Sequence, residues 1–459
     1  MGSGGMTAAE FASTLGIRVA VVERDRVGGD CLWTGCVPSK ALLASAKAAQ
    51  YMRTAAHYGL EPVEPTIDTA RVWSRIHAIQ DEIAGSDDNP ERFEALGVQV
   101  IRGAARLSGA GTVEVGERTL QTRFVLLCTG SRPVVPPIEG LAEAGFLSSE
   151  SVFELERAPA SMLLIGGGPI AIELAQAFNR LGLGTTVLQK GPGILPRDER
   201  DLVDILVAKL RHEGVELCFG VEASRVTTQN GLKTVHGTQD GAERSWSAAE
   251  ILVGAGRRPN VEQLGLEELG VELGPRGVVV DDSMRTSLDG VYAVGDVAGR
   301  NLFTHSAGFE AVRAVRNMFF PGRGKGDYAV PWCTFTDPEL AHTGLTTDEA
   351  RERFGADDVE VWRQDLSHSD RARADSASEG AIVIVTHKGR VVGGHILAPA
   401  AGEMIHELAL AIDQGLKLSE VATTIHVYPT VAIGVGQLAA EAAYESAQRY
   451  RWLVRKGKD

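Results

Sequence analysis

The sequence has no unbroken run of about 20 apolar residues, the length that a membrane-spanning helix requires. Its first residues, MGSGGMTAAEF, also lack the basic and apolar stretches of a secretory signal peptide. Positive charge is in deficit, because 46 lysines and arginines face 60 aspartates and glutamates, for a net charge of −14. Binding to a phosphate backbone depends on lysine and arginine, so this balance argues against a nucleic-acid partner. We expect a cytoplasmic protein that does not bind membranes.

Cysteine is also scarce, with five residues in 459, and two of them lie close together in GGDCLWTGC at 28–36. In a reducing compartment such a pair is more often catalytic or metal-binding than structural. A zinc site would need two further ligands, and no second Cys-x-x-Cys or histidine pair has the usual spacing. We therefore interpret Cys31 and Cys36 as a redox pair and expect no metal site. Core packing is the better interpretation of the three isolated cysteines, Cys128, Cys218 and Cys333.

Glycine, by contrast, is abundant, with 53 residues that cluster after apolar runs. Segment 2–23 aligns with segment 168–189 at a constant offset, so that Gly2 pairs with Gly168 and Glu23 pairs with Gln189. Each segment contains a glycine turn, a helix with small residues on one face and a short β-branched strand. This pattern is the first half of a dinucleotide-binding unit, so the sequence predicts two such units within an α/β fold.

The second copy of this unit has every expected part. SMLLI at 161–165 predicts a buried strand, and a glycine pattern follows it directly. Gly166 permits a tight turn, Gly168 lets the backbone approach a pyrophosphate, and Ala171 lets the helix pack on the strand. The strand–turn–helix context therefore predicts a nucleotide-binding site.

The first copy begins abruptly. Gly2, Gly4 and Gly5 fall in its glycine pattern, but the first fingerprint glycine and the leading strand would lie before Met1. We expect the first strand of this unit to be missing and the natural protein to begin upstream. An alternative is that MGSGG is an added linker before a native Met6.

Further motifs follow in chain order: LLCTGSRP (126–133), VGAGRRPN (253–260), TSLDGVYAVGDVAG (286–299), FTDPELAHTGLT (335–346) and VVGGHILAPAAGEMI (391–405). With GGDCLWTGCVPSKALL between the two nucleotide-binding units, the chain resembles the flavoprotein disulfide reductases along essentially its whole length. That family includes dihydrolipoyl dehydrogenase, glutathione reductase and mercuric reductase. The resemblance implies an enzyme, an FAD-dependent NAD(P)H oxidoreductase.

The resemblance also implies a domain order with two Rossmann-like domains and an α+β dimerisation domain. Residues 1–145 would begin the FAD-binding domain, 146–264 would bind NAD(P)H, 265–330 would return to the FAD-binding domain, and 331–459 would dimerise. A homodimer whose subunits share each active site would follow.

Each candidate site residue has a chemistry that suits the role implied. Cys36 precedes a predicted helix, and a helix N-terminus lowers the pKa of a thiol. The resemblance implies that Cys36 contacts the flavin and that Cys31 exchanges with the substrate. It also implies an ion pair of Lys40 with Glu173 beside the flavin. FAD would further be bound by Glu23, through its adenosine ribose, and by Asp296, through its ribityl chain. The remaining candidates for cofactor binding are Gly29, Gly130, Gly256 and Ala307.

The choice of nicotinamide cofactor depends on the position that matches Glu23 in the second unit, which is Gln189. An acid there would receive a ribose 2′-hydroxyl and would repel a 2′-phosphate. A neutral amide with Lys190 and Arg197 nearby removes that repulsion, and Ala171 resembles NADP-type fingerprints. The sequence favours NADPH over NADH.

The C-terminal region departs from the family pattern. Disulfide reductases carry a histidine and, five residues later, a glutamate, in a stretch resembling HPTLSE. This chain reads IHVYPTVAIGV, which places Tyr428 at the histidine position and Ile433 at the glutamate position. His426 lies two residues earlier, on the same face as Tyr428 if the segment is extended. It is either a substitute base or an ordinary loop or dimer-contact residue.

Three hypotheses about function remain open. In the first, the cysteine pair relays electrons to a small acceptor, either a disulfide, a metal ion or another thiol-reactive compound. Tyrosine at position 428 resembles mercuric reductase, but the chain ends YRWLVRKGKD without that enzyme's cysteine pair. In the second, the protein is an NAD(P)H:quinone or diaphorase-type reductase with direct transfer from the flavin. In the third, it is a catalytically impaired flavoprotein scaffold.

Overall fold

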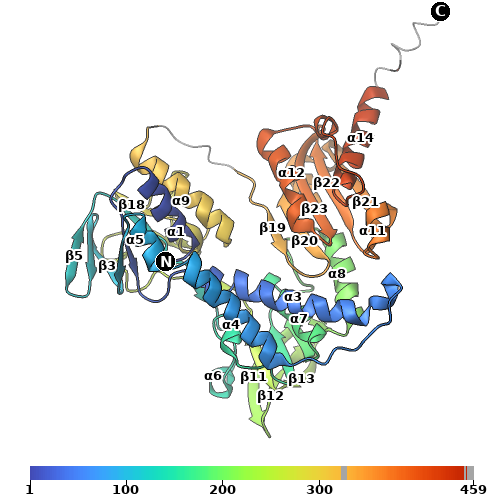
Figure 1. Ribbon diagram of the computed structural model, residues 1–459, viewed down its shortest axis with the longest axis horizontal. Coiled ribbons are helices and arrows are strands. Elements are labelled where there is room, and N and C mark those ends of the chain that lie inside the picture. The colour runs from blue at the N-terminus through green and yellow to red at the C-terminus, as the bar shows by residue number, and fades with distance from the viewer. Residues whose placement is uncertain (322–327, 449–450, 452–459) are drawn as a thin grey trace, which may run out of the picture.

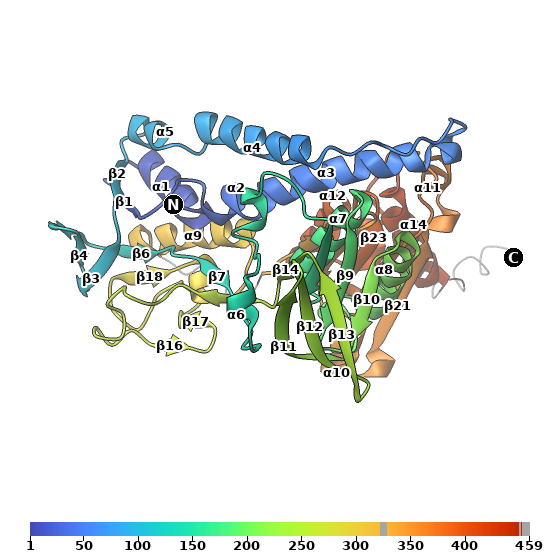
Figure 2. The same cartoon turned by 90° about the horizontal axis from the view of Figure 1, so that it is seen from below.

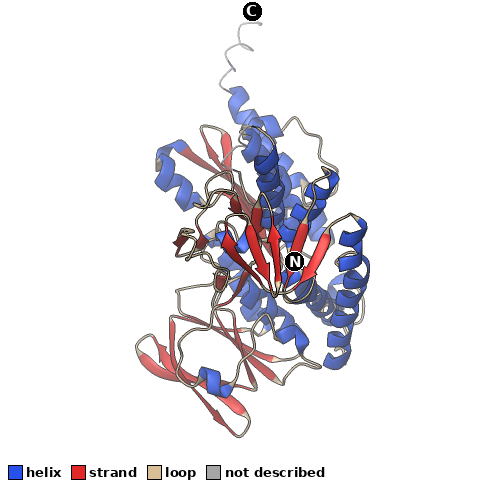
Figure 3. Ribbon diagram, turned by 90° about the vertical axis from the view of Figure 1, so that its left-hand side faces the viewer, coloured by secondary structure: helices blue, strands red, loops and turns tan. Residues whose placement is uncertain are grey.

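The computed structural model describes residues 1–321, 328–448 and 451. Figure 1 shows an N-terminal lobe around α1 (Ser3–Thr14), a central region and a C-terminal lobe. Helix α3 (Cys36–Arg53) runs from the N-terminal lobe towards the C-terminal lobe, and α4 (Thr69–Ser86) packs alongside it (Figure 2). The strands form several separate sheets (Figure 3).

The second nucleotide-binding unit is a four-stranded parallel sheet, with the order β10-β9-β8-β14. Strand β8 (Ser161–Ile165) lies inside it, and α7 (Pro169–Arg180) follows the glycine turn, as the sequence predicted. Met162 and Leu164 of β8 belong to the core shared with α7, whereas Leu163 and Ile165 belong to the core shared with the antiparallel sheet β11-β12-β13. Both faces of β8 are therefore covered, which explains its continuous apolar sequence. The other strands are β9 (Gly184–Gln189), β10 (Glu216–Phe219), β11 (Val221–Gln229), β12 (Leu232–Gln239), β13 (Ala242–Ala248) and β14 (Glu250–Val253).

The parallel strands of the first unit are split between two sheets. Strand β1 (Ala20–Glu23) pairs with β2 (Gln99–Arg102), and β18 (Val291–Ala293) pairs with β6 (Val125–Leu127). In the second unit β8 separates β9 from β14, but no described strand takes the corresponding place beside β1. The sequence predicted this gap. Helix α1 nevertheless packs against α9 (Thr304–Phe319) through buried alanines of both helices.

The C-terminal lobe is a five-stranded antiparallel sheet, β19-β20-β23-β22-β21, packed against helices. Helix α12 (Ala401–Gln414) buries Met404, Ile405 and Leu408 against this sheet, as expected for an amphipathic core helix. The lobe therefore has the α+β character that the sequence predicted. Its other elements are β19 (Trp332–Thr334), β20 (Glu339–Gly344), β21 (Val359–Asp365), β22 (Ala381–His387), β23 (Arg390–Ala398), α10 (Thr347–Phe354), α11 (Asp370–Ala374), α13 (Leu418–Val421) and α14 (Ile433–Gln448).

No helix in the described ranges combines the length and apolar character needed to cross a bilayer. The predicted domain boundaries at 146, 265 and 331 stay predictions. The remaining elements are α2 (Gly29–Trp33), α5 (Pro90–Ala95), α6 (Leu141–Ala144), α8 (Arg200–Glu213), β3 (Ala105–Gly109), β4 (Thr112–Val115), β5 (Arg118–Gln121), β7 (Ser131–Pro133), β15 (Arg257–Pro259), β16 (Leu273–Gly274) and β17 (Gly277–Val278), with 3-10 turns η1 (Ala55–Tyr58), η2 (Val152–Glu154), η3 (Gly295–Ala298), η4 (Ala356–Asp358) and η5 (Leu366–His368).

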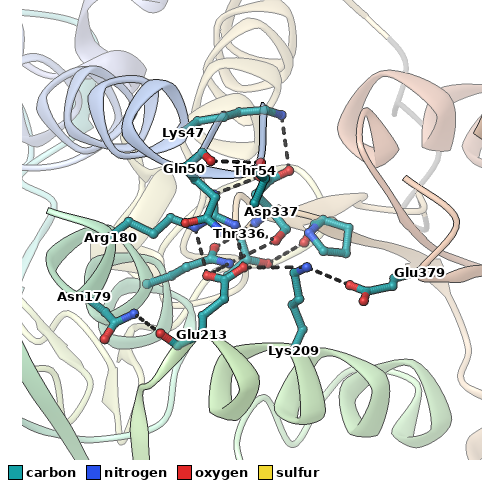
Figure 4. Close-up of polar contacts among 12 residues, drawn as sticks. Lys47, Gln50, Thr54, Asn179, Arg180, Lys209, Glu213, Thr336, Asp337 and Glu379 are labelled. Atoms are coloured by element: carbon teal, nitrogen blue, oxygen red, sulfur yellow. Dashed lines mark hydrogen bonds and ion pairs between the residues drawn. The ribbon is translucent and has the colours of Figure 1, made fainter. Parts of the chain in front are cut away.

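A buried ion network joins the C-terminal lobe to the second nucleotide-binding unit (Figure 4). Arg180 of α7 is only 3% exposed and lies 2.7 Å from Glu213 of α8 and 2.8 Å from Asp337. Lys47 of α3 lies 3.3 Å from the other oxygen of Asp337. Asp337 follows β19 of the C-terminal lobe. The Arg180 guanidinium and the Asp337 carboxylate therefore connect this lobe to three helices, namely α7, α8 and α3.

Replacing Arg180 by methionine should destabilise the fold strongly, because the Glu213 carboxylate is 4% exposed and would lose its guanidinium partner. Breaking one side of a buried pair costs about 3–5 kcal/mol. Urea unfolding followed by circular dichroism measures this loss. The control is Arg371→Met, which removes an exposed pair with Asp375 and should cost less than about 1 kcal/mol. Equal unfolding midpoints for the two variants would contradict a structural role for the network.

Candidate active site

One large cleft, with a volume of about 3570 Å³, brings together nearly all the predicted cofactor and cysteine residues. Strand residues of both small parallel sheets of the first unit line it, as do the first turns of α1, α3 and α9. The predicted residues that line it are Gly2, Gly4, Gly5, Glu23, Gly29, Cys31, Cys36, Lys40, Gly130, Gly166, Gly168, Glu173, Gln189, Lys190, Arg197, Gly256, Asp296 and Ala307. Ala171, His426 and Tyr428 are not among its lining residues.

The N-terminus of α1 fits the anionic part of a dinucleotide. Gly2 precedes the helix, and no side chain caps its first N–H groups. A Cβ added to Gly29 would lie 2.6 Å from the Cα of Gly2, so the two backbones pass in contact. Uncapped N–H groups at a helix N-terminus bind phosphate, and this wall of the cleft therefore suits the pyrophosphate of FAD.

Carboxylates lie where the first unit would hold the sugar parts of that cofactor. Glu23 ends β1 and accepts a hydrogen bond of 2.7 Å from the backbone N–H of Asp25. Asp296 accepts a hydrogen bond of 2.5 Å from the hydroxyl of Ser131. Burial raises the pKa of Asp296, although the bond from Ser131 opposes this shift. Both residues line the cleft, which is consistent with the roles that the family resemblance implied for them.

The two cysteines lie side by side at the start of α3. Cys31 belongs to α2, Cys36 is the first residue of α3, and both are half-buried and reduced. A hydrogen bond from the Cys31 thiol lowers the pKa of Cys36, and the nearby Lys40 ammonium lowers it further. The same bond, together with burial, raises the pKa of Cys31. Cys36 is thus the more acidic thiol of the pair, and Cys31 the less acidic one.

The predicted ion pair also forms. The Lys40 ammonium lies 2.9 Å from one carboxylate oxygen of Glu173, a residue whose side chain is 7% exposed. The second oxygen accepts the backbone N–H of Phe335 at 2.8 Å, and the Lys40 ammonium lies 4.2 Å above the Phe335 ring. The C-terminal lobe therefore helps to hold a positive charge close to the cysteine pair.

The glycine turn of the second unit has the close approaches that its sequence predicted. Gly166 has a φ of +124°, and a Cβ there would meet the carbonyl oxygen of Gly254 at 2.4 Å. Ala171 is fully buried, and its Cβ lies 3.2 Å from the position of a Cβ on Gly254. A larger residue at 171 would therefore push the helix away from the strand.

The predicted cations Lys190 and Arg197 line the cleft, and one further cation lies beside the second unit. The amide of Gln189 donates to the carbonyl oxygen of Gly193 at 3.2 Å, and Lys190 is exposed. The guanidinium of Arg197 lies 4.5 Å above the ring of Trp332, a residue of the C-terminal lobe. Arg200 packs against Gly193 and donates to the carbonyl oxygen of Ile194 at 3.3 Å. The sequence analysis missed Arg200, because only the turn at 191–194 brings it back towards Gln189.

The C-terminal candidates point in different directions, so the expectation that they share one face is wrong. The Nε2 of His426 lies 3.0 Å from Glu407 of α12, and its Nδ1 lies 3.1 Å from the carbonyl oxygen of Thr424. Tyr428 is 66% exposed, and its hydroxyl donates to Asp370 at 3.2 Å. The segment is a loop and not a strand, because His426 fastens it to α12. Nothing near position 426 in the sequence indicated Glu407 as its partner.

Comparison with known proteins gives the family. The model described as pyridine nucleotide-disulphide oxidoreductase matches residues 1–316, and the model of that family's dimerisation domain matches residues 330–439. The chain belongs to this family of enzymes. The expected fold class and enzyme class are thereby confirmed, as are FAD and an NAD(P)H electron donor, on which the family depends.

Relatives of this family member have different named activities. The chain is 34% identical to dihydrolipoyl dehydrogenase from Thermus scotoductus, over 97% of this chain and 96% of that protein. It is also 34% identical to mercuric reductase from Acidithiobacillus ferrooxidans, over 96% of this chain and 81% of that protein. Among solved structures, LpdA from Mycobacterium tuberculosis has a TM-score of 0.87 at 26% identity, covering 96% of this chain and 97% of its own. The HOCl-induced flavoprotein disulfide reductase RclA from Escherichia coli has a TM-score of 0.83 at 25% identity, covering 96% and 98%.

Proposed function

We propose that this family member is a reductase in which Cys31 and Cys36 deliver an electron pair from NAD(P)H to a small thiol-reactive acceptor. The observation that supports this most directly is the position of Cys31 and Cys36 in the cleft, with Cys36 at the first turn of α3, where its surroundings lower its pKa while those of Cys31 raise its pKa. Structural cysteines have no need of a lowered pKa, whereas nucleophilic ones do. For a disulfide acceptor the overall reaction converts NAD(P)H, a proton and the disulfide into NAD(P)⁺ and two thiols.

FAD, when bound, supplies the chemistry that accepts hydride from the nicotinamide and passes two electrons to the sulfur pair. The chain's own residues position these groups. The N-terminus of α1 would bind the pyrophosphate, and Asp296 and Glu23 would hold the two sugar parts. Lys40, held by Glu173 at 2.9 Å, supplies a positive charge beside the site of hydride transfer.

We propose a homodimer in which each active site is completed by the partner subunit. The loop at 424–430 supports this, because Ile425, Val427 and Tyr428 are 95%, 74% and 66% exposed on the family's dimerisation domain. Both ring nitrogens of His426 have partners within the subunit, which favours a structural role over that of a base. Tyr428 is the residue of this loop available to meet the acceptor. Five cysteines in 459 residues suit a reducing compartment, so we retain the cytoplasm as the proposed location.

The second candidate function is an NAD(P)H:quinone or diaphorase-type reductase, in which the flavin reduces the acceptor directly. The feature that favours it is the absence of a histidine at position 428, since direct transfer needs no acid–base for a leaving thiolate. The two functions differ in whether Cys31 is required for turnover.

Replacing Cys31 by serine should therefore abolish turnover with a thiol-reactive acceptor, because Cys36 alone cannot form and release a mixed disulfide by exchange within the pair. Reduction of bound flavin by NADPH should continue at a similar rate. Stopped-flow absorbance at 450 nm and steady-state assays with a disulfide acceptor measure the two steps separately. Cys218→Ser, a buried cysteine outside the cleft, is the matched control and should keep full turnover. Turnover of Cys31→Ser above half of the wild-type value would instead support direct transfer from the flavin.

We also propose NADPH as the preferred donor, held at its 2′-phosphate by Lys190 and Arg197, which line the cleft beside the neutral Gln189. Replacing Gln189 by glutamate should lower kcat/KM for NADPH about tenfold or more, because a carboxylate would repel the phosphate. It should leave or improve kcat/KM for NADH. An unchanged ratio of the two kcat/KM values would count against this assignment. Arg197→Met should also lower kcat/KM for NADPH, whereas Arg200→Met, which removes a cation that pairs with Asp204 and does not line the cleft, should change the ratio little.

A further inference from the structure

Two helix N-termini from distant parts of the chain meet at the sulfur of Cys36. Cys36 is the first residue of α3, and Thr304 is the first residue of α9. The Thr304 hydroxyl oxygen lies 3.4 Å from the Cys36 sulfur, a hydrogen-bonding distance for sulfur, across 268 positions of sequence. The pKa of Cys31 is raised mainly by Cys36 and by burial, but a hydrogen bond with the same Thr304 hydroxyl opposes this shift. The hydroxyl therefore lies within reach of both sulfurs of the redox pair, and its contact with Cys36 joins α9 to α3.

Each element packed around Cys36 contributes a group that acts on its charge. Cys31 of α2 donates a hydrogen bond, which is the largest influence and favours the thiolate. Burial opposes the thiolate, while Thr304 of α9 and Lys40 of α3 favour it. The Glu173 carboxylate of α7 opposes the thiolate at longer range. Its negative charge is paired with the Lys40 ammonium at 2.9 Å. The thiolate thus has two hydrogen-bond donors, Cys31 and Thr304.

These two donors differ in what happens to them during turnover. With a disulfide acceptor R–S–S–R, the Cys31 sulfur attacks one sulfur, forms Cys31–S–S–R, and its proton leaves with the first RSH. The Cys36 thiolate then attacks the Cys31 sulfur, forms the Cys31–Cys36 disulfide and releases the second RS⁻, which takes a proton from water. Between the two steps Cys31 has no S–H left to donate. Thr304 keeps its O–H throughout.

We propose that Thr304 is a positioning residue that holds Cys36 as an oriented thiolate, above all while Cys31 is engaged with the acceptor. This inference rests on the proposed relay through the cysteine pair. A hydroxyl donor suits the task because it is neutral, stays protonated at every working pH and approaches from the helix whose N-terminus already favours a negative charge.

The test isolates the contribution of Thr304 by removing the other donor. In a Cys31→Ala background, Thr304 is the side-chain hydrogen-bond donor that Cys36 keeps among the described residues, as in the mixed disulfide. The rate of Cys36 alkylation by iodoacetamide is then measured from pH 5 to 10 by peptide mapping, for Cys31→Ala alone and with Thr304→Val or Thr304→Ser. Valine has nearly the shape of threonine without the hydroxyl, and serine keeps the hydroxyl. Equal thermal unfolding of the three proteins establishes that they are equally folded.

We expect Thr304→Val to raise the apparent pKa of Cys36, because hydrogen bonds to charged groups are strong. At a pH below the Cys36 pKa of both the parent and the valine variant, alkylation should slow about tenfold. Thr304→Ser should stay within about twofold of the Cys31→Ala parent. The proposal is overturned if the valine and serine variants titrate alike, or if valine titrates like the parent. Alkylation needs no nucleotide and no acceptor. A failure here is therefore separate from a failure of the relay, which the turnover of Cys31→Ser decides.

Discussion

The proposed chemistry depends on the stabilisation of one negative charge, that of the Cys36 thiolate. An isolated thiol is largely protonated at neutral pH and would be a poor electron carrier beside a flavin. In this protein the charge lies at the start of α3, accepts a hydrogen bond from Cys31, and has the Lys40 ammonium one helical turn away. These influences outweigh the cost of burial, and they make the two cysteines unequal. In the proposed relay this inequality gives Cys36 the role beside the flavin and Cys31 the exchange with the acceptor.

The rest of the architecture serves to bring these groups to one point. Helix α3 carries Cys36 and Lys40 at one end and Lys47 further along, so the ion network around Arg180 and Asp337 fixes the same helix that positions the thiolate. The C-terminal lobe contacts residues at both ends of this arrangement. Asp337 pairs with Arg180, and the backbone N–H of Phe335 donates to the Glu173 carboxylate. The lobe that matches the dimerisation domain is therefore in direct contact with the residues that hold the cysteine pair in place.

Local sequence patterns predicted most of the fold and the larger part of the candidate site. The glycine turns, strand β8, helix α12 and the gap beside β1 could all be inferred from residues within about twenty positions of one another. Pairing of Lys40 with Glu173 came from the family resemblance, since no local pattern joins residues so far apart. Thr304, Arg200 and Glu407 escaped prediction for the same reason. Each acts through a contact that only tertiary packing creates. In the sequence, such a threonine, arginine or glutamate cannot be told from any other polar residue on a helix. For His426 the sequence left two interpretations open, a substitute base or an ordinary loop residue, because the Glu407 side chain that pairs with it lies 19 positions away on α12.

The most direct measurement of the central claim is an anaerobic titration of the flavin-loaded dimer with NADPH, followed across the visible spectrum. If electrons rest on the cysteine pair, the first equivalent should leave the flavin oxidised and should produce the long-wavelength absorbance of a thiolate beside it, at about 530 nm or beyond. That absorbance should disappear when Cys36 is replaced by serine. Bleaching of the flavin by the first equivalent, with no long-wavelength absorbance, would show that electrons do not pass to the sulfur pair and would contradict the account.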